Sequence, residues 1–207
     1  MKILLVNGSP HEKGCTYTAL QEIAKTLEAE GIAAELFHIG TEPISGCTAC
    51  GACRELGKCI IPDCVNDFRE LAKDADGFIF GSPVHYAAAS GALTSFMDRL
   101  FYSDRGQSFY LKPAAAVVSA RRGGTTAAFD QLNKYFTIAQ MPIISSNYWN
   151  MIHGNTPEQV MQDVEGLQIM RVLGRNMAWF LKCKEAGLKA GIQFPEREAN
   201  ISTNFIR

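Results

Sequence analysis

Short apolar segments alternate with amphipathic segments along this chain at roughly thirty-residue intervals, and this alternation constrains the fold more than any other feature. The segments with the unbroken apolar character of strands buried on both faces are 2–7, 33–39, 76–81, 114–119 and 142–144. The segments with apolar residues at helical spacing are 16–30, 65–73, 90–102, 125–137 and 158–184. Right-handed crossovers between parallel strands then predict an α/β fold, a doubly wound five-stranded parallel sheet in three layers, α/β/α.

The length of 207 residues leaves room for one domain with a sizeable core. We expect residues 1–207 to form a single domain, with a cysteine-rich insertion at about 40–64 and a C-terminal helix plus tail after about 157. A loop as long as this insertion is usually functional when it lies inside a domain.

Charge and hydropathy exclude several classes of protein. The 20 Lys and Arg residues nearly balance the 21 Asp and Glu residues, and the formal net charge of −1 provides no general attraction to nucleic acid or to anionic membranes. No apolar run approaches the ~18 residues of a membrane-spanning helix, and the opening run 3–6 is too short for the core of a signal peptide. We therefore expect a cytoplasmic protein without nucleic-acid or membrane partners, whose 7 cysteines are ligands, redox thiols or buried apolar residues.

A loop rich in glycine and hydroxyl groups follows the first predicted strand. Gly8 and Gly14 allow tight backbone geometry, and the loop opens onto a helix whose free N–H groups carry partial positive charge. Hydroxyl donors are available from Ser9, Thr16 and Thr18. In an open parallel sheet the ligand crevice lies at the carboxyl ends of the strands, so this loop indicates a phosphate site. The alternative is a simple capped turn before a helix.

Two common nucleotide-binding motifs do not match this loop. A P-loop has Lys directly after its second Gly, whereas Cys15 occupies that position here, and the spacing from Gly8 to Gly14 is one residue too long. A dinucleotide fingerprint requires a second Gly where this chain has Pro10, and an acidic residue at the end of the second strand, which residues 38–40 do not supply. A phosphate monoester such as FMN remains as the predicted ligand.

Two further strand ends are suited to the flat ring of FMN. Residues 81–86 follow the third predicted strand with imidazole and aromatic groups that can flank or stack on a ring. Residues 119–124 follow the fourth, where two glycines allow close backbone approach and Arg122 brings positive charge to the N1 and O2 edge of a reduced flavin. Taken singly, an aromatic such as Tyr86 can belong to the core, and arginines are more often solvated than functional. Together, these segments occupy the strand ends expected to border the crevice.

The motifs at these strand ends resemble those of a known family. The motifs that carry the resemblance are Gly8-Ser9-Pro10 with Gly14 and Thr16, the run 81–86, Ser90-Gly91 and Met97-Asp98-Arg99. Through them the chain resembles the NADPH-dependent FMN reductase and iron-sulfur flavoprotein group of flavodoxin-like proteins. The resemblance covers residues 1–150, and its departure is Cys15, where relatives often carry Asn or Ser. It implies a flavodoxin-like fold and an FMN site that includes Ser9, His11, Thr16, Thr18, Pro83, Val84, His85, Tyr86, Ser119 and Gly124.

A compact group of cysteines lies inside the expected insertion. Cys47, Cys50 and Cys53 have the spacing of bacterial ferredoxins, and Cys59 follows after a turn. Small residues between them let the backbone wrap around an inorganic core, so these four thiolates indicate a [4Fe–4S] cluster, with Cys64 as a surplus thiol. Structural zinc is disfavoured because it usually takes two separated Cys-x-x-Cys units. The alternative is a flap with free or oxidised thiols, which covers the flavin or contacts another subunit.

The expected activity is that of an FMN-dependent NAD(P)H oxidoreductase, which passes electrons from a nicotinamide donor to a small-molecule acceptor such as a quinone or a flavin. No catalytic side chain is assigned, because the flavin carries the chemistry. The alternative is an iron-sulfur flavoprotein that carries electrons between a protein donor and acceptor, with a ferredoxin-like protein as partner. We expect a homodimer or homotetramer, in which Tyr148, Trp149 and the tail 191–207 are candidate contacts.

Overall fold

The computed structural model describes residues 1–205, in which parallel strands form a sheet with the order β2-β1-β3-β5-β6. These strands are β1 (Lys2–Asn7), β2 (Ala33–His38), β3 (Gly77–His85), β5 (Ala114–Ala120) and β6 (Met151–His153). A short strand, β4 (Ala88–Ala89), pairs antiparallel with the end of β3. The chain first builds outward from β1 to β2 and then returns past β1 to β3, which is the doubly wound arrangement predicted from the sequence.

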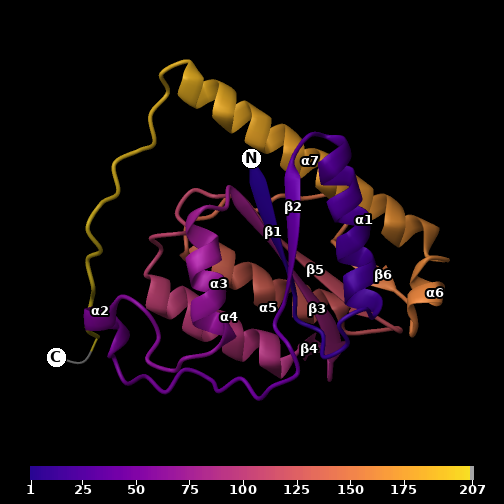
Figure 1. The fold of residues 1–207 in the computed structure, drawn as a ribbon, viewed down its shortest axis with the longest axis horizontal. Coiled ribbons are helices and arrows are strands. Elements are labelled where there is room, and N and C mark those ends of the chain that lie inside the picture. Colours follow the sequence, from indigo (N-terminus) through magenta and orange to yellow (C-terminus); the bar gives the residue numbers. More distant parts are fainter. Residues whose placement is uncertain (206–207) are drawn as a thin grey trace.

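Helices cover both faces of this sheet (Figure 1). One face carries α1 (Cys15–Ala29) and α7 (Val164–Lys189), and the other carries α3 (Cys64–Lys73), α4 (Gly91–Asp104) and α5 (Thr125–Ile138). Two single-turn helices, α2 (Cys53–Leu56) and α6 (Pro157–Val160), lie in the connections. The three-layer α/β/α architecture is therefore confirmed.

The two cores explain the unbroken apolar character of the strands. Successive side chains of a strand point to opposite faces, so Ile3 and Leu5 pack under α1 and α7, whereas Leu4 and Val6 pack under α3 and α4. A strand that is buried on both faces needs apolar residues at every position. Phenylalanines dominate the second core, where the rings of Phe68, Phe78, Phe80 and Phe96 contact one another.

The fifth strand does not lie where the sequence predicted it. Residues 142–144 make only an isolated parallel bridge, between Ile143 and Ala114, and the chain then leaves the sheet before it returns as β6. Ala114 bonds the carbonyl of Pro142 and the N–H of Ile144, but no further residue of this segment pairs, so the triplet does not extend into a strand. The predicted position was wrong by nine residues, because the strand is 151–153 rather than 142–144.

Other boundaries differ in ways that matter for the site. The strand β3 continues through Pro83, which pairs with β5. Its pairing with β1 has already ended at Gly81, so no hydrogen bond to β1 is lost because Pro83 lacks an N–H. The long helix predicted over 158–184 is divided into α6 and α7, since the side chain of Asp163 accepts from the N–H of Gly166 and starts a new helix. The predicted tail extends to residue 207, but residues 206 and 207 lie outside the described part.

Within residues 1–205, no helix combines the length and the apolar character that crossing a membrane requires.

Candidate functional site

The carboxyl ends of β1, β3 and β5 lie side by side and bring the three predicted loops together. The register pairs Asn7 with Gly81 across β1 and β3, and Pro83 with Ser119 across β3 and β5. The loop 8–14, the turn after β3 and the loop after β5 therefore border one edge of the sheet. This is the crevice position at which open α/β sheets bind ligands.

The loop after β1 is organised by Asn7, which is 1% exposed. Its Oδ1 accepts from the backbone N–H of Ser9 at 3.1 Å, and its Nδ2 donates to the carbonyl of Glu12 at 3.0 Å. The Oγ of Ser9 in turn accepts from the backbone N–H of His11 at 3.1 Å. Sequence reasoning assigned no role to Asn7, although Asn at the end of a strand commonly bonds the backbone of a following turn.

Gly8 is required at its position by close packing. Its N–H donates to the carbonyl of Gly81 at 2.8 Å, and its own carbonyl accepts from the Oγ of Ser90 at 2.8 Å. A Cβ on Gly8 would lie 2.8 Å from the side chain of Leu93, inside van der Waals contact. The loop is thereby fixed both to β3 and to the start of α4, where Ser90 is the N-cap residue.

The helix α1 begins without a side-chain cap within the described residues. Gly14 occupies the N-cap position, and the first turn contains no acidic residue. Two hydroxyls predicted as ligands are already engaged, because Thr16 Oγ1 shares a hydrogen bond with Ser119 Oγ at 2.9 Å and Thr18 Oγ1 donates to the carbonyl of Gly14 at 3.1 Å. The backbone N–H groups of the first turn, supported by the helix dipole, are therefore the donors best placed for a phosphate.

Two histidines lie near this loop. His11, which was predicted as a ligand, is exposed within the loop itself. His38 is the last residue of β2, and its Nε2 lies 2.8 Å from the carbonyl oxygen of Ser9. Since a carbonyl only accepts, Nε2 carries the proton and donates to it. His38 thus holds the loop from a neighbouring strand, a contact that sequence spacing does not reveal.

A strained hairpin borders the crevice at the end of β3. Val84 and His85 pair with β4, and the turn residues Tyr86 and Ala87 have φ values of +50° and +60°, which L-residues rarely adopt. The Tyr86 side chain is fully exposed. Gly124 has a φ of +92°, and a Cβ there would lie 2.7 Å from the Cα of Ala87. The turn therefore packs directly against Gly124, at the start of α5.

Other predicted residues lie at the surface. Arg122 is exposed in the loop between β5 and α5. Tyr148 and Trp149 are each about half exposed, at 53% and 51%, and their ring centroids are 4.8 Å apart. They lie in the segment that precedes β6, the strand at the edge of the sheet, because the strand predicted at 142–144 forms later in the chain.

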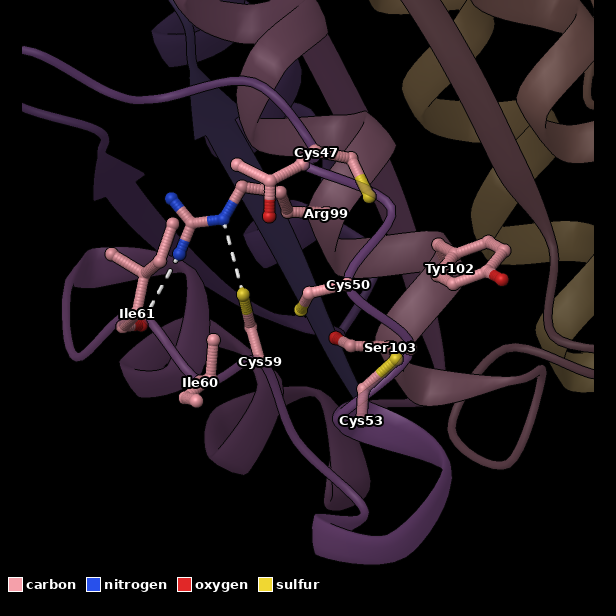
Figure 2. Close-up of a pocket in the computed structure, with 11 residues that line it drawn as sticks. Cys47, Cys50, Cys53, Cys59, Ile60, Ile61, Arg99, Tyr102 and Ser103 are labelled. Atoms are coloured by element: carbon pink, nitrogen blue, oxygen red, sulfur yellow. Dashed lines mark hydrogen bonds between the residues drawn. The ribbon is translucent and has the colours of Figure 1, made fainter.

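The four cysteines predicted as ligands line one pocket (Figure 2). Cys47, Cys50 and Cys53 approach it along one arm of the insertion, and Cys59 comes from the returning arm after α2. The helix α2 ends at Gly57, whose φ of +65° makes the predicted turn. The rest of the lining consists of Thr48, Gly51, Ile60, Ile61, Arg99, Tyr102 and Ser103.

The donor set of this pocket fits an iron-sulfur cluster better than a single ion. Within residues 1–205 all seven cysteines are free, and no three His, Cys, Asp or Glu side chains converge closely enough to hold one metal ion. Each thiolate of a [4Fe–4S] cluster binds its own iron, so its four ligands surround a volume instead of meeting at a point. Soft thiolates around a largely apolar pocket are the ligands that such clusters use.

The thiols of the insertion differ in acidity. Hydrogen bonds from the backbone N–H of Ala52 and from the Thr48 hydroxyl lower the pKa of Cys50 below its ordinary value. Burial raises the pKa of Cys64 to about 11, and its Sγ donates to the carbonyl of Ile39. Cys64 is not among the described residues that line the pocket.

Comparisons with known proteins add an independent observation. The model of the NADPH-dependent FMN reductase family matches residues 1–156. An iron-sulfur flavoprotein of Methanocaldococcus jannaschii is 32% identical over 189 residues, which cover 88% of this chain and 98% of that protein. An NADPH azoreductase of a Bacillus species is 30% identical over 129 residues, 61% of this chain and 64% of that protein. A flavodoxin from the domain Archaea, with a TM-score of 0.61 and 17% identity over 88% of this chain and 99% of that one, shares the fold.

The difference in thiol acidity predicts an order of alkylation. In metal-free protein, Cys50 is expected to react with iodoacetamide at lower pH than Cys64, because a lowered pKa gives the reactive thiolate earlier as pH rises. Mass spectrometry of proteolytic peptides, sampled from about pH 6 to about pH 10, measures both sites in one experiment. Cys183, exposed on α7, serves as the reference thiol, and alkylation of Cys64 before Cys50 would contradict the prediction.

Proposed function

The chain belongs to the NADPH-dependent FMN reductase family, and we propose that this FMN-dependent oxidoreductase takes electrons from NAD(P)H and passes them to a small acceptor such as a quinone or a free flavin. FMN, when bound, supplies the hydride-accepting chemistry. The observation that carries the proposal is the start of α1, which has no side-chain cap and faces the crevice. The loop before it contains Gly8, a position at which any side chain would clash with Leu93.

The residues at this edge have distinct roles in the proposed complex. The first-turn N–H groups of α1 bind the phosphate, and His38 and Asn7 hold the loop in the shape that presents them. The hairpin at Tyr86 and the loop at Gly124 border the ring, with Ser119 and Arg122 at the end of β5 and beyond it. The protein therefore positions the cofactor and sets its surroundings, and no side chain is needed as an acid or base.

A second function is favoured by the cysteine pocket. Four free thiols line it, and the relative from Methanocaldococcus jannaschii is named an iron-sulfur flavoprotein. In this alternative Cys47, Cys50, Cys53 and Cys59 hold a [4Fe–4S] cluster, and the protein carries electrons between a protein donor and a protein acceptor, with a ferredoxin-like protein as a suitable partner. Free thiols are also what a reducing cytoplasm maintains.

The first function is tested by adding NADPH to anaerobically purified protein. We expect a yellow preparation whose flavin absorbance bleaches rapidly, because the nicotinamide reduces bound FMN directly. The Gly8→Ala variant is expected to bind FMN at least about tenfold more weakly, equivalent to about 1.4 kcal/mol, since its Cβ would push the loop away from Leu93.

The matched control for this test is Gly91→Ala, because a Cβ at Gly91 has no neighbour within 4 Å. It should retain FMN, and circular dichroism should show that both variants are folded. A colourless protein that takes up no added FMN would overturn the proposal. Absorbance that only a protein donor can reduce would favour the electron carrier over the reductase.

The cluster is tested by removing one ligand. Cys50→Ser is expected to lose most of the iron taken up in anaerobic reconstitution, because a hydroxyl is a much poorer ligand for iron than a thiolate. Cys64→Ser should keep its iron, since Cys64 does not line the pocket. Iron and acid-labile sulfide are measured per protein chain, and equal contents in the Cys50→Ser variant and the parent protein would contradict the ligand assignment.

We also propose a homodimer or homotetramer. Tyr86 is fully exposed at the flavin edge, and Tyr148 and Trp149 project at the β6 edge of the sheet, where a second copy can cover them. Trp149→Ala together with Tyr148→Ala is expected to shift the assembly towards monomer in light scattering. A parent protein that is monomeric at micromolar concentration would refute the proposal.

A further inference from the structure

Arg99 is a buried cation for which the proposed flavin site has no use. It belongs to the Met97-Asp98-Arg99 motif and lies on α4, and it is the largest fully buried side chain of the described residues, with an exposure of 1%. Burying a guanidinium costs several kcal/mol unless its donors are satisfied and its charge is balanced. The partners of Arg99 therefore indicate which part of the structure its burial stabilises.

All the hydrogen-bond partners of Arg99 belong to the cysteine insertion. Its Nε donates to the Sγ of Cys59 at 3.2 Å, and Nη2 donates to the carbonyl of Ile61 at 3.2 Å (Figure 2). Nη1 and Nη2 donate to the two carboxylate oxygens of Asp63 at 2.5 and 2.8 Å, a bidentate ion pair. Nη1 also lies 3.4 Å from the carbonyl of Ser45, on the other arm of the insertion. One side chain thus joins both arms to α4.

The charge of Arg99 is also close to the ligands. Among the described residues that line the cysteine pocket, it is the one with a formal charge. Asp63 balances that charge from the side away from Cys59, and its side chain is 27% exposed whereas that of Arg99 is 1% exposed. The anion is therefore screened by solvent more than the cation.

The same helix connects this pocket with the flavin edge. The Oγ of Ser90, the N-cap of α4, donates to the carbonyl of Gly8 in the phosphate loop, and Arg99 lies nine residues further along, or about 14 Å by helical rise. A rigid element thus sets the separation between the two sites.

We propose that Arg99 tunes the cysteine pocket, by fixing Cys59 in place and by lending positive charge to its sulfur, so that a cluster held there accepts an electron more readily. The inference rests on the second proposed function. Hydrogen bonds to the sulfurs and the local net charge are the main protein contributions to the reduction potential of an iron-sulfur cluster. Gain of one electron adds one negative charge and needs no proton, and a nearby cation stabilises that state.

A purely structural role makes different predictions. If Arg99 only anchors the insertion, variants that keep the iron should also keep the potential. If Arg99 acts through charge, removing the cation and removing its counter-ion should move the potential in opposite directions. Asp63→Asn provides the second change, because Asn retains the side-chain oxygen that accepts from the N–H of Val65 and starts α3.

The experiment uses the full chain after anaerobic reconstitution with iron and sulfide. The midpoint potential is measured by reduction with dithionite, followed by electron paramagnetic resonance, in the parent protein and in Arg99→Met, Arg99→Lys and Asp63→Asn. Arg99→Met is expected to disfavour reduction about tenfold, which is 59 mV for one electron. Arg99→Lys should stay closer to the parent, and Asp63→Asn should shift the potential upward.

The matched control is Arg69→Lys. Arg69 is a buried arginine of α3 that pairs with Asp104 and has no thiol contact among the described residues, so this variant should leave the potential unchanged. If Arg99→Met holds no iron, Asp63→Asn decides alone: an upward shift of the potential supports the charge effect, and an unchanged or lowered potential overturns it.

The possible failures are distinguishable. A parent protein that takes up no iron overturns the cluster proposal, and the role of Arg99 with it. Normal iron uptake with unchanged potentials in Arg99→Met and Asp63→Asn overturns the role of Arg99 alone. Shifts of both variants in the same direction also overturn it, because a charge effect requires opposite signs.

Discussion

Parallel pairing of strands that are buried on both faces determines where this protein can place chemistry. Because β1, β3 and β5 run in the same direction, their carboxyl ends meet at one edge, and the loops that follow them share a crevice. The polar residues that these strands contribute to the site, Asn7, His38 and Ser119, lie at their carboxyl ends. Chemistry is therefore restricted to the strand ends, the helix termini and the long insertion between β2 and α3.

The crevice depends on backbone more than on side chains. Gly8 and Gly124 are required by close approach of neighbouring atoms, and Gly14 leaves the start of α1 uncapped. Of the side chains that the motif suggests as phosphate ligands, Thr16 bonds to Ser119 of β5 and Thr18 bonds to the carbonyl of Gly14. An uncapped helix start and a strained turn at Tyr86 both cost local stability, which is typical of positions that serve a function.

The helix α4 is the element that relates the two candidate sites. Its N-cap, Ser90, is bonded to the phosphate loop, and Arg99 is bonded to both arms of the cysteine insertion. The insertion contains little regular structure of its own, only the single-turn α2 among the described residues. Its position relative to the crevice is set by this buried arginine with its ion pair to Asp63, together with the hydrogen bonds that Asn66 of α3 makes to Cys59 and Ile61.

The sequence alone determined the fold class, the positions of β1, β2 and β5, the glycine-rich loop after β1 and the spacing of the four cysteines, because each of these depends on local spacing and on the period of apolar residues. The fifth strand was misplaced, since an apolar triplet at Pro142 is a poor guide to where an edge strand pairs. Only the tertiary structure revealed the hydrogen bonds of His38 to the loop after β1, of Thr16 to Ser119, and of Arg99 to Cys59. Those contacts join residues that are 29, 103 and 40 positions apart, and such pairings arise from strand order and helix packing, which no local pattern encodes.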